Sequence, residues 1–180
     1  MTNTYKDKSE NTILPPIPEE LISEFKNTVH QLSFIENNNE KLEKIYNFLD
    51  SYNKFIDTFS VCHNGCSACC KNEVQITKLE AQYIQDNTEH LISNNYFNKN
   101  WDCPFLINDS CSIYNTRPFS CRTMHTLDDP KYCETNEEHQ LYGAYFGKGV
   151  PIYEQLAAII KTISPEIKDI RYYFQKIKNK

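Results

Sequence analysis

Eight cysteines in a chain of 180 residues constrain the fold more than any other feature of the sequence. Their order is Cys62-x3-Cys66-x2-Cys69-Cys70, followed by Cys103, Cys111, Cys121 and Cys133. Disulfide bonds form and persist in oxidising compartments. The polar N-terminus, Met1 to Asn11, has no apolar signal-peptide core, so we expect a cytoplasmic protein with reduced thiols. Metal binding or redox chemistry then explains the cysteines better than a disulfide framework does.

The rest of the composition predicts a folded and soluble chain. A chain of this length buries roughly 70% of its unfolded surface, so it can build a core without disulfides. The hydrophobic fraction is 39%, and no apolar run approaches the ~18 residues of a membrane span. The formal net charge of −5 argues against nucleic-acid binding through bulk charge. We therefore expect a metal ion or cluster as partner, and neither nucleic acid nor a membrane. The sequence identifies no protein partner.

Two helices are predicted ahead of the cysteines, as a helical hairpin over residues 15–59. Residues 1–14 are polar and aperiodic, and we expect them to form a disordered leader. Pro18 suits the first position of a helix, with acidic residues in the turn that follows. Asn37 to Asn39 separate the two helices. Their apolar residues recur at helical spacing: Leu21, Phe25, Val29 and Leu32, then Leu42, Ile45, Leu49, Tyr52 and Ile56.

The cysteine-cluster region, residues 60–135, shows little periodicity. Thr77 and Glu80 fit a capping box, T-x-x-E, which predicts a helix continuing to about His90. Prolines interrupt the stretch from 93 to 150, where no long periodic segment is visible. A region of this length without regular structure is unusual in a compact domain unless something else orders it. Bound metal would supply that order.

Residues 150–178 are predicted to be C-terminal helices. The first has an apolar face formed by Leu156, Ile159, Ile160 and Ile163. Ser164 is expected to cap a second helix with Pro165 at its first position. The apolar face of that helix would be Ile167, Ile170, Phe174 and Ile177. The predicted fold class is therefore mainly α: one domain over residues 15–180, with helices at both ends around an irregular, cysteine-rich metal-binding centre.

The cysteine pattern favours an iron–sulfur cluster over zinc and leaves both open. All eight cysteines are candidate ligands, and seven or eight thiolates exceed the four ligands of one zinc ion. Cys62, Cys66 and Cys69 come near the spacing of a ferredoxin, although the first gap is one residue too long. Zinc bound by four thiolates, or by three thiolates and an imidazole of His63 or His125, is the other interpretation.

Five motifs follow one another over about residues 62–125: CHNGCSACCKN, CPFL, CSIY, RP and CR. Together they resemble the YkgJ-like cysteine-cluster family, whose pattern is CxxCxxCC and which is described as a zinc- or iron-chelating domain. The resemblance implies a metal or iron–sulfur centre. This chain has three residues between Cys62 and Cys66 where the family pattern has two. Cys133 lies beyond the matching segment and is the cysteine that a packing role would suit.

The resemblance also bears on a possible enzymatic activity. One relative with the same cysteine motif is the flagellin lysine methylase. This chain has no GxGxxG and no P-loop, and no glycine lies between Gly65 and Gly143. We therefore expect a metal-binding protein with a redox, sensing or metal-handling role. An enzyme that uses the centre for group transfer, such as a protein lysine methylase, is the alternative. A helical adaptor ordered by zinc is a third interpretation.

Three further residues are candidates for the cofactor site. Arg117 and Arg122 flank Cys121, where guanidinium groups would offset the negative charge of a thiolate-rich centre. Tyr114 is expected to pack over the centre or to hydrogen-bond beside it. Glu80 is explained as a helix cap, and no residue is assigned a catalytic role.

Overall fold

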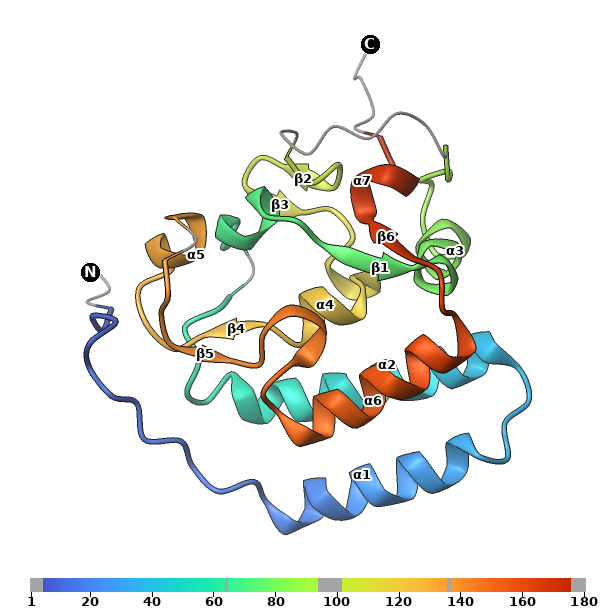
Figure 1. Cartoon of the computed structure of the whole chain (residues 1–180), viewed down its shortest axis with the longest axis horizontal. Coiled ribbons are helices and arrows are strands. Elements are labelled where there is room, and N and C mark those ends of the chain that lie inside the picture. The colour runs from blue at the N-terminus through green and yellow to red at the C-terminus, as the bar shows by residue number, and fades with distance from the viewer. Residues whose placement is uncertain (1–4, 64, 94–101, 136, 176–180) are drawn as a thin grey trace.

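The structure, a computed structural model, describes residues 5–63, 65–93, 102–135 and 137–175 (Figure 1). Within these ranges the chain forms seven α-helices and six short strands. The long helices from both ends of the chain lie on one side of the molecule, and the short elements of the middle lie on the other. The predicted class, mainly α with helices at both ends, is confirmed.

The predicted N-terminal hairpin is α1 (Glu19–Leu32) followed by α2 (Asn38–Ile56). Asn37, in the turn between them, is the N-cap of α2. Its side chain accepts hydrogen bonds from the backbone N–H groups of Asn39 and Glu40. The apolar stripe of α2 is fully buried at Leu42, Ile45, Leu49, Tyr52 and Ile56. Burial of each such side chain stabilises the fold by roughly 1.5–3 kcal/mol, which makes α2 the central helix of the core.

Helix α6 (Pro151–Ile163) covers α2 and confirms the first C-terminal helix. Its residues Tyr153, Leu156 and Ile160 are fully buried in the same apolar core as the α2 stripe. The rings of Tyr52 and Tyr153 meet edge to face with centroids 5.5 Å apart. This larger core, built from both ends of the chain, forms the base on which the middle of the chain rests.

A smaller apolar core surrounds a two-stranded antiparallel sheet. Strand β1 (Gln75–Thr77) pairs with β6 (Ile167–Asp169), with Gln75 opposite Asp169 and Thr77 opposite Ile167. Helix α3 (Lys78–Asp86) follows β1 directly and starts with the predicted capping box of Thr77 and Glu80. It ends at Asp86, sooner than the predicted end near His90, because Asn87 and Thr88 donate their side-chain hydrogen bonds back to carbonyls of its last turn.

The prediction of a second C-terminal helix from Ser164 onward is wrong. Residues Ile167–Asp169 form β6, and the only helix that follows in the described residues is the four-residue α7 (Ile170–Tyr173). Long-range contacts decide this: β6 pairs with β1, and the Ser164 hydroxyl accepts from the N–H of Leu79 instead of capping its own helix. Ile170 and Phe174 are buried as predicted, but in the smaller core; Ile177 lies outside the described residues.

The middle of the chain consists of short elements, as its lack of periodicity predicted. They are η1 (Ala68–Lys71), β2 (Leu106–Ile107), β3 (Ser110–Cys111), η2 (Tyr114–Thr116), α4 (Phe119–Arg122), β4 (His125–Thr126), α5 (Lys131–Thr135), β5 (Leu141–Tyr142) and η3 (Tyr145–Gly147), where η is a 3-10 helix. Strands β2 and β3 form one antiparallel pair, and β4 and β5 form another.

The N-terminal segment differs from the disordered leader predicted for residues 1–14. In the described part, from Tyr5 onward, the carbonyl of Lys6 accepts a hydrogen bond from the N–H of Asp129, and the carboxylate of Asp7 accepts one from the hydroxyl of Tyr132. The segment therefore lies against α5 and the turn before it. None of the helices in the described part of the chain combines the length and the hydropathy that a membrane crossing requires.

Candidate metal centre

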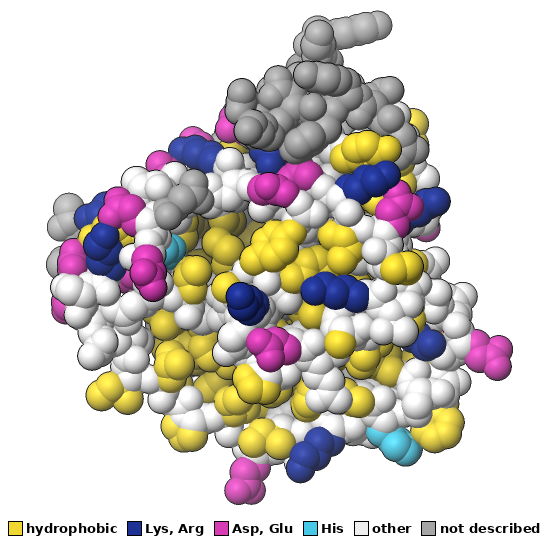
Figure 2. All heavy atoms as spheres, viewed as in Figure 1, with side chains coloured by type: hydrophobic (Ala, Val, Ile, Leu, Met, Phe, Trp, Pro, Cys, Tyr) yellow, Lys and Arg dark blue, Asp and Glu magenta, His cyan; other side chains and the backbone are white. Residues whose placement is uncertain are grey.

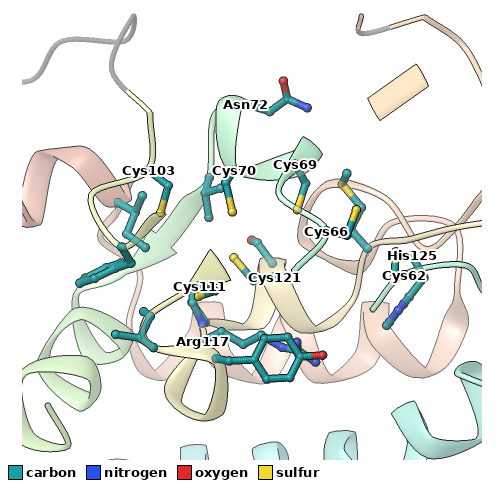
Figure 3. Close-up of a pocket in the computed structure, with 18 of the residues that line it drawn as sticks. Cys62, Cys66, Cys69, Cys70, Asn72, Cys103, Cys111, Arg117, Cys121 and His125 are labelled. Atoms are coloured by element: carbon teal, nitrogen blue, oxygen red, sulfur yellow. The ribbon is translucent and has the colours of Figure 1, made fainter. Parts of the chain in front are cut away.

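Within the described residues, seven of the eight cysteines line one pocket (Figure 3). They are Cys62, Cys66, Cys69, Cys70, Cys103, Cys111 and Cys121. Phe105, Ile113 and Ile170 of the smaller core form part of its wall. The cavity volume is about 150 Å³, whereas on this measure ~10–15 Å³ holds one water molecule. The pocket therefore has room for a metal ion or a small cluster.

The first four cysteines reach the pocket through a tight loop. Gly65 has a φ of +94°, a conformation that glycine adopts without steric cost. The N–H of Cys66 then donates to the carbonyl of His63 at 3.1 Å, which closes the turn. The 3-10 helix η1 follows and carries Cys69 and Cys70 on successive positions. The backbone thus brings four thiols of one short segment to the pocket.

The later cysteines reach the same pocket from a hairpin and a short helix. Asn108 and Asp109 both have positive φ and form the turn between β2 and β3, which brings Cys111 opposite Leu106. The N–H of Cys103 donates to the carbonyl of Cys70 at 2.9 Å, which joins this segment to the first loop. Cys121 lies on α4. Segments far apart in the sequence therefore meet around the cavity.

Backbone N–H groups donate to several of the sulfurs. The N–H of Thr126 lies 3.2 Å from Sγ of Cys62. Cys66 accepts a hydrogen bond from the N–H of Ala68 in the same way, and Cys111 accepts one from the N–H of Ile113. Such donors orient metal-bound sulfur and stabilise its negative charge. The loops are thus folded so as to favour thiolates once a cation is present.

Without a cation, the surroundings favour the protonated thiols. Burial raises the pKa of Cys62 to about 12 and that of Cys133 to about 11. A hydrogen bond with Cys103 is the main cause that raises the pKa of Cys70 to about 12. Burial also raises the pKa of further thiols, namely Cys66, Cys111 and Cys121. A bound metal would reverse this preference, because its own charge stabilises the thiolate.

Arg117 and Tyr114, both candidates for the cofactor site, line the pocket. Among the described residues that line it, Arg117 carries the only permanent positive charge. Its guanidinium carbon lies 3.9 Å from the centroid of the Tyr114 ring, so the ring holds the charged group in place. This charge opposes the rise in thiol pKa at Cys69, Cys111 and Cys121. Arg117 is thus positioned to offset the charge of a thiolate centre.

Arg122, predicted to flank the cofactor, is not among the residues that line the pocket. Its side chain is only 2% exposed and lies over the ring of Tyr46. It donates to the carbonyls of Arg117 and Asn115 and to the carboxylate of Asp50. These contacts fix the loop that presents Arg117, so Arg122 positions another residue and does not itself face the cavity.

Both histidines considered as zinc ligands line the pocket. Burial lowers the pKa of His125 to about 4, so its imidazole is neutral at neutral pH. Nε2 of His125 lies 3.0 Å from the carbonyl oxygen of Arg122, which assigns the ring proton to Nε2. The lone pair then resides on Nδ1. His63 comes from the first cysteine loop, and its imidazole is the other side chain at the pocket that could bind a metal through nitrogen.

Two buried charged residues, Arg171 and Glu80, make contacts near the cysteines that the sequence did not predict. Arg171, which the sequence analysis left aside, is buried and lies close enough to Cys103 for their charges to interact. The only feature of the sequence that could have pointed to Arg171 is the small number of arginines in the chain, which is three. Glu80 caps α3 as predicted, but its carboxylate also accepts from the hydroxyl of Tyr46 and the N–H of Phe119. It therefore ties α3 to α2 and to the helix that carries Cys121.

The donor set fits a metal centre in kind, although the side chains do not yet converge. Within the described ranges, no three cysteine, histidine or acidic side chains are close enough together to hold an ion as they stand. The thiols face a shared cavity from short, loop-like elements.

Comparison with known families bears directly on the segment that builds this pocket. Residues 61–141 match the family model CxxCxxCC, described as a putative zinc- or iron-chelating domain. This segment is similar to CxxCxxCC domains. The resemblance predicted from the motifs is confirmed, and the matching segment extends far enough to include Cys133. It supports a metal-binding site in the chain. Searches of curated proteins and of solved structures found no match.

Proposed function

We propose that the chain binds an iron–sulfur cluster or zinc through cysteine thiolates, with the cluster as the favoured cofactor. One observation carries the proposal: seven thiols from distant parts of the chain line a common cavity. Buried cysteines that act only as small apolar residues have no reason to gather in this way. Soft sulfur ligands suit both zinc and iron–sulfur clusters.

The number and setting of the thiols favour a cluster over a single zinc ion. One zinc ion takes four ligands, and more thiols than that face the cavity. Hydrogen bonds from backbone N–H groups to sulfur, together with burial, are among the features that set the potential of a cluster. A redox or sensing role would use that setting directly. Because such a role requires reduced thiols, it fits a cytoplasmic location.

Binding the metal would change the protonation of the pocket. Each cysteine that ligates loses its S–H proton to solvent, and a metal–sulfur bond takes its place. Arg117 would then compensate part of the remaining negative charge. Tyr114 and Arg122 would hold Arg117 in position, one through its ring and the other through its hydrogen bond to the Arg117 carbonyl.

The alternative is an enzyme that uses the centre for group transfer, such as protein lysine methylation. The exposed rim of the pocket favours this enzymatic alternative, because a substrate needs access to the centre. Tyr145 lines the pocket and is 52% exposed. On the face drawn in Figure 2, side chains coloured as hydrophobic, a class that includes cysteine, spread across the middle, and a few basic and acidic side chains lie among them. A substrate could approach the centre from this side. Binding of a methyl donor by the metal-loaded protein would distinguish this activity from redox or sensing.

Anaerobic purification with iron, zinc and acid-labile sulfide analysis tests the proposal. Iron with a similar amount of sulfide, together with visible charge-transfer absorption, is the expected result. Zinc without sulfide would replace the cluster by a thiolate zinc site and favour the adaptor role. Protein that takes up neither metal under reducing conditions would overturn the proposal.

A further inference from the structure

The position of Cys133 suggests more than one centre. Cys133 is buried on α5 and is not among the residues that line the pocket. It nevertheless shares a neighbour with Cys62. The N–H of Thr126 donates to the sulfur of Cys62 at 3.2 Å, and the side chain of Thr126 shares a hydrogen bond with the thiol of Cys133. One threonine therefore holds two cysteines that are far apart in the sequence.

Two thiols of the first loop complete a group around this pair. Cys133 lies close enough to Cys66 and Cys69 for their charges to interact, and Cys62 has the same two neighbours. Helix α5 is held against η1 by a 2.7 Å hydrogen bond from the Asn72 side chain to the carbonyl of Cys133. A first group of four thiols follows: Cys62, Cys66, Cys69 and Cys133.

The other four thiols are connected through Cys70, which is a neighbour of each of the remaining three. The thiol of Cys70 hydrogen-bonds with that of Cys103, whose N–H donates to the Cys70 carbonyl. Cys111 is the next charge neighbour of Cys70. Cys121 interacts first with Cys69 and then with Cys111 and Cys70. In Figure 3, Cys103, Cys70, Cys111 and Cys121 lie together on one side, and Cys66 and Cys62 lie on the other.

The adjacent residues Cys69 and Cys70 lie at the boundary between the two groups. Their thiols hydrogen-bond with each other, yet their further neighbours differ. Cys70 alone of the two is a neighbour of Cys103, whereas Cys69 is the charge neighbour of Cys62, Cys66 and Cys133. Both are charge neighbours of Cys111 and Cys121. Eight thiols divided four and four match the requirement of two clusters or two zinc ions.

We propose that the domain holds two separate four-thiolate centres, one at Cys62, Cys66, Cys69 and Cys133 and the other at Cys70, Cys103, Cys111 and Cys121. This inference rests on the proposed metal-binding function and assigns the ligands within it. Each centre forms when four S–H groups release their protons to solvent and four metal–sulfur bonds replace them. Cys133 is thereby a ligand and not a packed thiol.

The test compares metal and sulfide per chain in full-length variants purified without oxygen. For two four-iron clusters the wild type should hold about eight iron atoms, against about four for one cluster. Cys133→Ser and Cys103→Ser should each lose about half of the metal, and the double variant should lose nearly all. Cys62→Ser combined with Cys133→Ser should lose no more than Cys133→Ser alone, because both ligate one centre. Met124→Leu, a pocket-lining sulfur assigned to neither centre, is the matched control.

The outcomes separate this inference from the function on which it rests. A wild type with one centre per chain, or a Cys133→Ser variant with wild-type metal content, overturns the second centre and leaves metal binding intact. A wild type without metal overturns both. The wild-type stoichiometry needs no variant, so it decides the question even if a serine substitution prevents folding.

Discussion

The carboxylate of Glu80 on α3 accepts a hydrogen bond from the N–H of Phe119, the first residue of α4, at 2.7 Å. The same carboxylate accepts from the Tyr46 hydroxyl on α2 and from the N–H of Thr77. One buried side chain thus connects the main core to the helix that carries Cys121. A sequence motif for a helix cap is therefore also a support for the metal centre.

Removal of this carboxylate should destabilise the fold. Glu80→Ala leaves four buried donors without this acceptor: the Tyr46 hydroxyl, the Phe119 N–H, and the N–H and hydroxyl of Thr77. Each costs about 1–3 kcal/mol, so we expect a loss of at least ~4 kcal/mol. Chemical denaturation monitored by circular dichroism measures it. Glu43→Gln, at an exposed position on α2, is the control and should change stability little. A Glu80→Ala protein as stable as the wild type would show that the cap is dispensable.

The two arginines beside Cys121 should behave differently when replaced. Arg117→Gln removes the charge that faces the pocket, so metal should be lost to a chelator faster, with little change in the stability of the metal-free protein. Arg122→Gln removes hydrogen bonds to two carbonyls and should cost about 2 kcal/mol of stability. Chelator competition and thermal unfolding separate the effects. Equal chelator sensitivity in both variants would contradict the assignment of Arg117 as the residue that faces the centre.

Metal removal should loosen the middle of the chain and spare the helices at its ends. Helices α1, α2 and α6 pack in a core that contains no cysteine, whereas the pocket is built from short elements. Chelation should preserve most of the helical far-ultraviolet signal and make residues 62–133 sensitive to protease. Mass spectrometry of the fragments locates the cuts. Loss of all helical signal, or an apo middle that still resists cleavage, would go against this expectation.

Alanine substitutions at Gly143 and Gly149 form a matched pair that tests how closely the backbone packs at Gly143. Both have positive φ, but a Cβ at Gly143 would lie 2.1 Å from the Thr123 carbonyl oxygen, whereas one at Gly149 meets open space. Gly149→Ala should cost only the left-handed backbone strain, about 1–2 kcal/mol. Gly143→Ala should cost clearly more, because the backbone itself must move. Similar melting temperatures for the two variants would disprove the close approach.

Local sequence signals predicted the helical ends and failed where distant segments pair. The α2 stripe is correct at every predicted position because one helix face determines it. The segment from Ile167 to Phe174 has apolar residues at spacings that a helix also allows. Its pairing with Gln75–Thr77 depends on a strand far away in the sequence, which no local pattern reveals.

The site was predictable in its chemistry but only partly in its arrangement. Clustered cysteines indicated metal binding, and seven of them do line one pocket. The neighbours of Cys133 could not be foreseen, because they depend on Thr126 and on the contact between α5 and η1. Arg122 lies next to Cys121 in sequence, yet its side chain points to carbonyls and Tyr46, since the turn of α4 separates it from the cavity.

The pairing of β6 with β1 has a consequence for the order of assembly. A chain synthesised only as far as Cys133 already carries every cysteine, yet it lacks Ile170, which forms part of the pocket wall, and β6, which pairs with β1. Domains generally fold as units once their residues have emerged. We therefore expect the pocket to be complete only after the C-terminal strand has emerged.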